Sequence, residues 1–173
     1  IHEYCISLSD GNFGNAKFFY DGNEVNINPV SLLGSYDFAD GNLSLGKAIN
    51  STGANGTVGI GYQAAKSVTT AAGLTAVGYK AATSLVDGHS NTALGYEALY
   101  SEVASDESTA VGYRALYSQS GSTSTLGNTA VGNQAGYNTT TAYRNTYVGK
   151  SAALNVTTGQ QNTAIGWTAL QNV

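Results

Sequence analysis

The chain has 173 residues, and only 10% of them are charged, whereas a typical soluble domain contains about 25%. Serine, threonine and asparagine together supply 52 residues, alongside 22 glycines, one proline, one cysteine (Cys5) and no methionine. With a formal net charge of −4, this composition excludes a basic nucleic-acid-binding surface, a membrane-spanning run of roughly 18–20 apolar residues, an intrachain disulfide and a thiolate zinc site.

Residues 1–43 differ in chemistry from the rest of the chain. They hold all four phenylalanines, the proline and six acidic residues against one lysine. Asp-Gly-Asn triplets begin at Asp10, Asp21 and Asp40 and predict tight turns, and 17–27 reads as a β-hairpin. We expect a small β cap that closes one end of the following domain. The triplets are too far apart to favour a calcium loop over plain turns.

From residue 44 onward the sequence is repetitive. A string of the form Asn-Thr-Ala-Val-Gly ends at seven glycines, and the interval between consecutive glycines is seventeen in every case but one. The exception is longer by three residues, which fall in the Ser/Gly-rich stretch 118–127. Residues 43–48 form a degenerate first copy. The seven glycines are Gly61, Gly78, Gly95, Gly112, Gly132, Gly149 and Gly166.

The repeat predicts an all-β fold, a parallel β-solenoid of about seven turns over residues 44–173. Seventeen residues cannot hold a pair of packed helices, and the repeated core is β-branched and punctuated by glycine. Stacking equivalent residues about 4.8 Å apart generates such a coil. Because 42% of the residues are hydrophobic, we expect it to be folded rather than disordered.

The alternation of side chains in a strand assigns the repeated residues to two faces. The threonine and the apolar residue before each glycine share one face, and the intervening alanine and the preceding asparagine (Asn91, Asn128, Asn145 and Asn162) share the other. We expect the glycine to provide a positive φ at a corner, the asparagines to bond to the corner backbone, and the small alanines to let a second chain approach. An Ala-rich face of this kind predicts association of chains.

An aromatic residue follows the glycine in five units and forms the candidate site of the chain. Stacked aromatic rings can stabilise the coil or a subunit contact, or offer a platform for sugar rings. We favour the stabilising ladder over the glycan platform, because a regular ladder needs no ligand to explain it. The column comprises Tyr62, Tyr79, Tyr96, Tyr113 and Trp167.

The sequence offers little for catalysis, so we predict no enzyme activity, no cofactor and no metal site. His2 and His89 lack the spacing of a triad or metal motif, and His89 reads as a loop residue in solvent. Glu102, Asp106 and Glu107 form the only local acid cluster in the repeats; we interpret it as a solvated corner rather than the carboxylate pair of a glycosidase.

At 91–99, 109–116, 128–135 and 162–170 the sequence resembles the Asn-Thr-Ala-Val/Ile-Gly-Tyr-x-Ala-Leu repeats of phage tail fibres and other virion fibres. It is also similar to the β-roll heads of trimeric autotransporter adhesins, although the repeat unit of those heads is shorter. The resemblance spans about 46–173. It implies a homotrimer, a fibrous shape and a part in host attachment.

The resemblance therefore predicts a structural fibre and attachment protein on a virion surface or extracellular appendage. Its expected partners are further copies of the chain, other virion or fibre proteins through the N-terminal segment, and a host surface glycan, with no nucleic acid and no membrane insertion. The chain begins with Ile1, which we take as a sign of a longer fibre protein. The alternatives are the head of a bacterial trimeric adhesin and, with less support, a glycan-cleaving spike or an ice-binding solenoid.

Overall fold

The computed structural model describes the backbone of residues 4–8, 16–20, 23–25, 35–37 and 42–46, and both backbone and side chains of 55–121 and 126–172. The chain forms two compact units, Ile1–Leu33 and Gly34–Val173. The two units divide after Leu33, ten residues before the boundary that we predicted after residue 43. The boundary is earlier because a strand at 35–37 pairs with the first strand of the repeat region.

The first unit contains a three-stranded antiparallel sheet in the order β1-β2-β3. Its strands are β1 (Tyr4–Leu8), β2 (Ala16–Tyr20) and β3 (Asn23–Val25). Phe18 lies opposite Val25 and Tyr20 opposite Asn23, so the predicted hairpin at 17–27 is confirmed. The predicted role as a cap stays a prediction, and Asp10, Asp21 and Asp40 lie outside the described residues.

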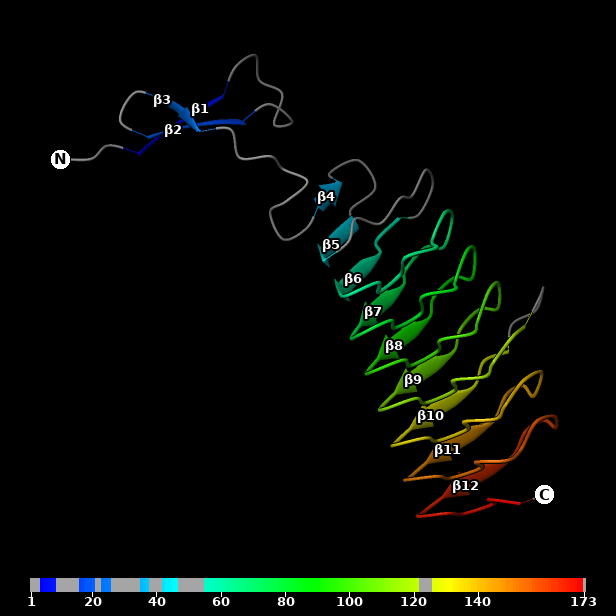
Figure 1. The fold of residues 1–173 in the computed structure, drawn as a ribbon. Helices are drawn as coiled ribbons and strands as arrows, with labels where there is room; N and C mark the ends of the chain where they lie inside the picture. Colours follow the sequence, from blue (N-terminus) through cyan, green and yellow to red (C-terminus); the bar gives the residue numbers. More distant parts are fainter. Residues whose placement is uncertain are drawn as a thin grey trace. The chain divides into compact units, whose positions relative to one another are not determined.

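The second unit is a β-solenoid built around one nine-stranded sheet (Figure 1). Strand β4 is antiparallel to β5, and β5 to β12 are parallel. The described residues contain no helix, so the all-β parallel solenoid predicted from the repeat is confirmed. The strands are β4 (Ser35–Asp37), β5 (Asn42–Gly46), β6 (Val58–Gly61), β7 (Thr75–Val77), β8 (Thr92–Leu94), β9 (Thr109–Val111), β10 (Thr129–Val131), β11 (Thr146–Val148) and β12 (Thr163–Ile165).

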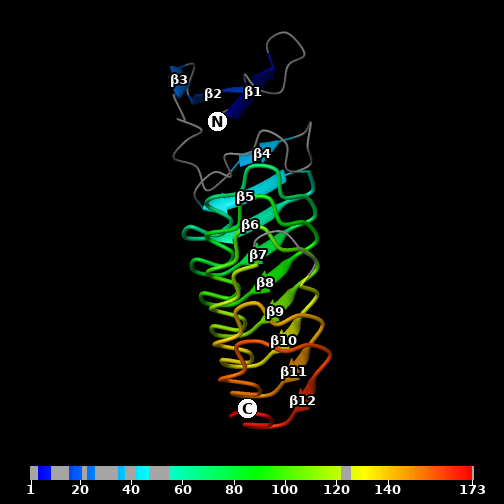
Figure 2. The same ribbon diagram turned by 90° about the vertical axis from the view of Figure 1, so that its right-hand side faces the viewer.

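Successive turns keep a strict register, and Figure 2 shows their strands as rungs one below another. Gly46 lies opposite Gly61, which confirms the degenerate first copy. Thr109 lies opposite Thr129 although their turn contains the insertion, so the three extra residues leave the ladder unchanged. The seven strands β6 to β12 are separated by about six turns. We predicted about seven turns because we counted the repeat units, and seven units enclose six turns.

The glycine that ends each repeat string occupies a corner where no other residue fits without strain. Its φ lies between 122° and 140° in all seven units. In six of them an added Cβ would overlap the carbonyl oxygen of the equivalent glycine in the next turn. Two requirements, a positive φ and close contact between successive backbones, therefore select glycine here.

Beyond the corner, the backbone alternates in a way that the sequence did not indicate. The residues two and four places after the glycine have φ near +50° even where they are Lys80, Glu97 or Leu99. Their N–H groups point along the coil axis: Glu97 donates to Tyr79 O in the preceding turn and Leu99 to Ala115 O in the following one. The αL conformation is held because it lets both turns satisfy their backbone polar groups.

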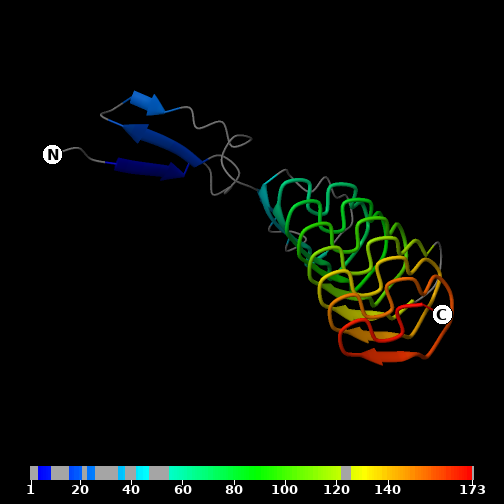
Figure 3. The ribbon, with the colours of Figure 1, turned by 60° about the horizontal axis from the view of Figure 1, so that its bottom comes forward.

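The interior is narrow and lined mainly by alanine. The strand alanines and the alanines three places after the glycine are almost all fully buried, together with leucines such as Leu85 and Leu99. In one turn Tyr147 replaces the strand alanine and is fully buried, and the space it needs is provided by Gly136, where an added Cβ would meet the Tyr147 ring at 2.8 Å. Figure 3, with the lower end brought forward, shows the turns superposed around this small interior.

The asparagines line one end of the interior as a buried hydrogen-bonded ladder. Asn128 Oδ1 accepts bonds from the Asn145 backbone N–H at 2.9 Å and from Asn145 Nδ2 at 3.1 Å. Asn145 Oδ1 accepts the same pair from Asn162. The predicted bonds from asparagine side chains to the backbone are present, but they join successive turns. The residue with positive φ is not the asparagine itself but the residue before it, such as Ser90 or Arg144.

Candidate functional site

The solenoid presents its strands outward as a flat face, which we name the sheet face. Each strand alanine points into the coil, so threonine and the apolar residue before the glycine point out. We predicted that the alanines would form the contact surface; they are buried instead, because the narrow coil has room mainly for small side chains behind the strands, and Tyr147 fits there only beside Gly136. The sheet face comprises Val58, Ile60, Thr75, Val77, Thr92, Leu94, Thr109, Val111, Thr129, Val131, Thr146, Val148, Thr163 and Ile165.

The sheet face carries no charged residue, and it combines a column of aliphatic side chains with a column of threonines. Leu94 is 45% exposed and Val131 is 37% exposed, in the middle of the stack where neighbouring rungs flank them on both sides. Contiguous exposed apolar surface on a soluble protein is a common mark of a contact with another chain. The face therefore has the chemistry of a contact between protein chains.

The aromatic column forms a continuous stack on a different side of the coil. The ring centroids of Tyr62 and Tyr79 lie 5.5 Å apart, those of Tyr79 and Tyr96 4.9 Å, and those of Tyr96 and Tyr113 5.4 Å, with interplanar angles of 12° to 18°. Trp167 occupies the same column three rungs beyond Tyr113, and Asn133 and Lys150 fill the intervening positions.

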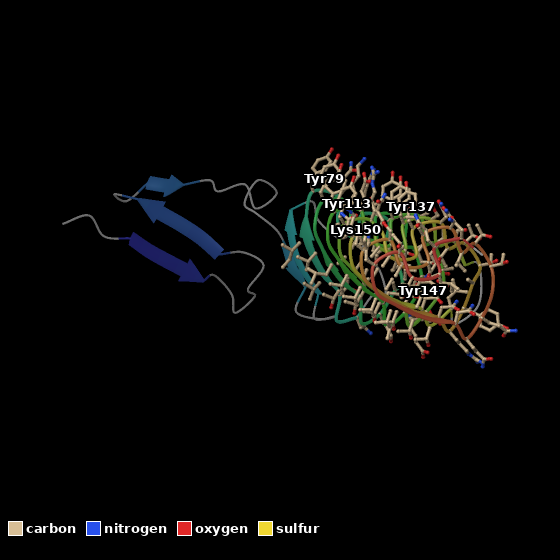
Figure 4. All side chains as sticks on the ribbon, turned by 90° about the horizontal axis from the view of Figure 1, so that it is seen from below. Tyr79, Tyr113, Tyr137, Tyr147 and Lys150 are labelled. Carbon is tan, nitrogen blue, oxygen red and sulfur yellow. The ribbon has the colours of Figure 1, made fainter. Side chains whose placement is uncertain are left out.

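A second tyrosine stack, not predicted from the sequence, runs beside the first. Tyr100 and Tyr117 have ring centroids 5.0 Å apart, and Tyr117 and Tyr137 are 5.1 Å apart. All three lie five places after a corner glycine, so the register alone could have revealed them. Figure 4 shows Tyr79, Tyr113 and Tyr137 projecting from one side of the coil, with Tyr147 inside its outline.

Two cations lie between the stacks. Lys80 Nζ is 5.3 Å from the Tyr79 ring centroid and 5.9 Å from that of Tyr100. Arg114 Cζ is 5.1 Å from the Tyr113 centroid and 5.2 Å from that of Tyr117. These cation–π contacts hold both long side chains in place. We name the residues one, two and five places after the corner glycines the tyrosine face.

The one acid on the tyrosine face is paired. Glu97 is 8% exposed, and its Oε2 accepts a hydrogen bond of 2.8 Å from Arg114 Nε. This bond raises the pKa of Arg114 above its usual value, and the Tyr79 hydroxyl, as the largest influence, raises the pKa of Lys80. Desolvation raises the pKa of Tyr96 and Tyr117. These pKa directions keep Lys80 and Arg114 protonated and Tyr96 and Tyr117 neutral at neutral pH.

Of the acid cluster that we predicted as a solvated corner, Glu107 is exposed and Asp106 is half-buried, but Glu102 is fully buried, so the prediction is wrong for Glu102. Its Oε1 accepts bonds from the N–H groups of residues 103, 104 and 105, and its Oε2 accepts from Gln119 Nε2 and the Gly121 N–H. Asp106 Oδ1 accepts from the His89 N–H at 2.6 Å. Glu102 therefore organises the coil beside the three-residue insertion and is shielded from any substrate.

The remaining candidates carry no site in the part of the chain that the structure describes. His89 is exposed, and its Nδ1 accepts a bond from the Ala72 N–H. Residues 55–121 and 126–172 contain no cluster of three His, Cys, Asp or Glu side chains placed to hold a metal ion. Among the described residues no helix has the length and hydrophobicity needed to span a membrane.

Comparisons of the chain with protein-family models, with curated proteins and with solved structures give no significant match.

Proposed function

We propose that this chain is a structural fibre and attachment module of a phage virion: a non-enzymatic shaft segment that assembles as a homotrimer. The observation that carries self-association is the uncharged sheet face, with Leu94 and Val131 exposed in mid-stack. Burying such a strip against further copies would gain roughly 25 cal/mol for each Å² of apolar surface removed from water. The number three and the virion setting come from the resemblance of the repeats.

The proposed mechanical role follows from the hydrogen bonds between turns. Each rung bonds to the next through the strand ladder and the αL residues, and the rungs of Asn128, Asn145 and Asn162 also bond through the asparagine ladder, so load along the axis is shared by several bonds in every turn. Within the coil, edges are confined to the two ends. We propose that the N-terminal unit joins the shaft to other virion or fibre proteins.

Light scattering coupled to size-exclusion chromatography tests this proposal. The expected mass is three times the 17.7 kDa of one chain. Val131→Lys places a charge on the sheet face and is expected to yield the single-chain mass. Val103→Lys is the matched control, since Val103 is 44% exposed and lies outside the strands. A wild-type monomer would contradict the trimer, and dissociation of both variants would mean that charge alone prevents association.

The head of a bacterial trimeric adhesin is the alternative within the same resemblance, and it predicts the same solution mass. A membrane-anchor domain in the full-length gene would favour it, whereas neighbouring virion genes would favour the phage fibre. A glycan-cleaving spike has less support, because Glu102 is buried and its oxygens accept several N–H bonds; release of reducing sugar from a host polysaccharide would revive it.

Ice binding is a second candidate function because of the threonine ladder on the sheet face. Six in-register threonines from Thr75 to Thr163 lie there, half-buried or exposed, at the rung spacing of about 4.8 Å. Ice would need the same face as the proposed trimer. A monomer that shows thermal hysteresis would support ice binding, and a trimer without it would eliminate this candidate.

A further inference from the structure

Charge is segregated around the solenoid. Four of the five lysine and arginine residues in the described repeats lie on the tyrosine face, against one acid, so that face has a formal excess of three positive charges. The other four acids of these repeats lie seven to twelve places after a corner glycine, toward the opposite end of the turn. The four bases of the tyrosine face are Lys66, Lys80, Arg114 and Lys150.

The stacking geometry determines what this face can recognise. Because successive rings cover one another at about 5 Å, the flat faces of the interior rings are not available for a sugar ring or a nucleobase. Hydroxyl groups, ring edges and cations remain at the surface. Glu97 engages only the Nε–H of Arg114, and a guanidinium has four further N–H donors. A row of donors suits a ligand that is rich in acceptors and negatively charged.

The cations follow the coil axis and so match a linear polymer. Lys66 and Lys80 lie on successive rungs, Arg114 two rungs further and Lys150 two rungs beyond that, with rungs about 4.8 Å apart. An excess of three positive charges is small beside the roughly 6–10 phosphates that a nucleic-acid-binding protein neutralises. Single-stranded nucleic acid also requires aromatic faces on which bases stack, and these are covered.

We propose that the tyrosine face binds an acidic polysaccharide along the solenoid axis. Carboxylate or sulfate groups would pair with Lys66, Lys80, Arg114 and Lys150, and sugar hydroxyls would hydrogen-bond to the tyrosine hydroxyls. An acidic polysaccharide would be the host-surface ligand of the proposed attachment module, so the biological role of this binding rests on the proposed function. The binding chemistry itself stands on the charges and stacks of this face.

Isothermal titration calorimetry of the full chain with polygalacturonate oligomers tests the proposal, with neutral dextran and poly-glutamate as comparison ligands. Polygalacturonate is expected to bind, with an affinity that falls as salt rises, and dextran is expected not to bind. Poly-glutamate should bind about tenfold more weakly, because it lacks sugar hydroxyls for the tyrosines. No binding to polygalacturonate, or equal binding to poly-glutamate, would overturn the proposal.

Matched lysine and arginine variants locate the site. Lys80→Gln should weaken polygalacturonate binding about two- to fivefold, the usual range for an exposed ion pair, and combination with Lys66→Gln and Lys150→Gln should abolish it. Arg144→Gln is the control, because Arg144 is an exposed base beside a tyrosine, 5.8 Å from the Tyr143 ring centroid, but lies off the tyrosine face. An equal loss in the Arg144 variant would overturn the assignment to this face.

Light scattering on the same samples separates this inference from the proposed fibre role. A trimer that does not bind polygalacturonate defeats only the ligand class, and a monomer that binds it defeats only the trimer. If the triple lysine variant stays folded by circular dichroism but loses its trimeric mass, the tyrosine face is a subunit contact, and the proposal is wrong.

Discussion

The sheet face and the tyrosine face are made by the same repeat, but they differ in backbone, side chains and charge. On the sheet face, extended strands pair through a β ladder and present threonine and aliphatic side chains without charge. On the tyrosine face, αL residues alternate along the chain and present stacked phenols and cations. A translation by one turn thus produces two faces with opposite chemistry.

The difference shows how stacking governs each side chain. Every residue has its equivalent about 4.8 Å above and below, so apolar and aromatic residues gain from contact with their own copies, whereas like charges repel. The tyrosine face tolerates cations because Lys80 and Arg114 are separated by the rung of Glu97, which pairs with Arg114. The scarcity of charge in the repeats follows from the same restriction.

The largest expected effect is at the corner glycine that joins the two faces. Gly95→Ala should lower the free energy of unfolding by about 3 kcal/mol or more, because its Cβ would overlap the Gly112 carbonyl and its φ is 138°. Chemical denaturation followed by circular dichroism measures this loss. Gly166→Ala is the matched control: φ is 122° and no atom lies within 4 Å of an added Cβ, so only the strain of about 1–2 kcal/mol should appear. Equal losses would contradict a role for the close contact.

A pair of truncations in one turn separates the faces. Tyr96→Ala removes two ring stacks and should lower stability by about 1–2 kcal/mol without changing the assembled mass. Leu94→Ala should affect unfolding less, because Leu94 is 45% exposed, but should lower the mass on dilution. Thermal unfolding and light scattering at matched concentrations measure both. The reverse pattern would exchange the roles assigned to the faces.

The smallest expected effect tests the backbone beneath each face. Gln134 has φ of 55°, so Gln134→Gly should stabilise the chain by about 0.5–1 kcal/mol by relieving the αL cost. Thr129→Gly, in the extended strand that precedes Gln134 in the same repeat unit, should destabilise it by about 1 kcal/mol through lost β propensity. Denaturation midpoints of the two variants should therefore shift in opposite directions. Shifts of the same sign would refute the contrast in backbone.

Much of the solenoid was predictable because each turn repeats the same signals. The strings around Gly61 to Gly166 specified strand positions, corners and turn length, and the Asp21-Gly22 pair located the hairpin. The same sequence pattern occurs in seven units, so the prediction of strands and corners does not depend on a chance match in any single unit.

The assignment of the inner side of the strand was wrong for a reason that is physical. Alternation shows that Ala93 and Leu94 point in opposite directions, but it does not say which direction is inward. Hydrophobicity favours leucine inside, whereas the space behind the strand is filled by alanine in most turns and holds the larger Tyr147 only where Gly136 lies against it. The interior width is set by the whole turn, which no single strand encodes.

The αL residues and the buried Glu102 were missed because their identities carry no local signal. Lys80 and Glu97 rarely adopt positive φ by themselves; the bonds between turns impose it. Glu102 reads as a surface acid until the backbone N–H groups that surround it are placed. Both features depend on neighbours one turn away.

The unchanged ladder across the three-residue insertion has an evolutionary consequence. Since Thr109 still faces Thr129, residues added at that corner change neither the pitch nor the number of rungs, whereas duplication of a whole repeat unit adds one rung to both faces together. Gain or loss of units by slippage during replication would thus lengthen or shorten the proposed chain contact and the proposed polysaccharide-binding face together. Drift in corner length would leave both unaltered.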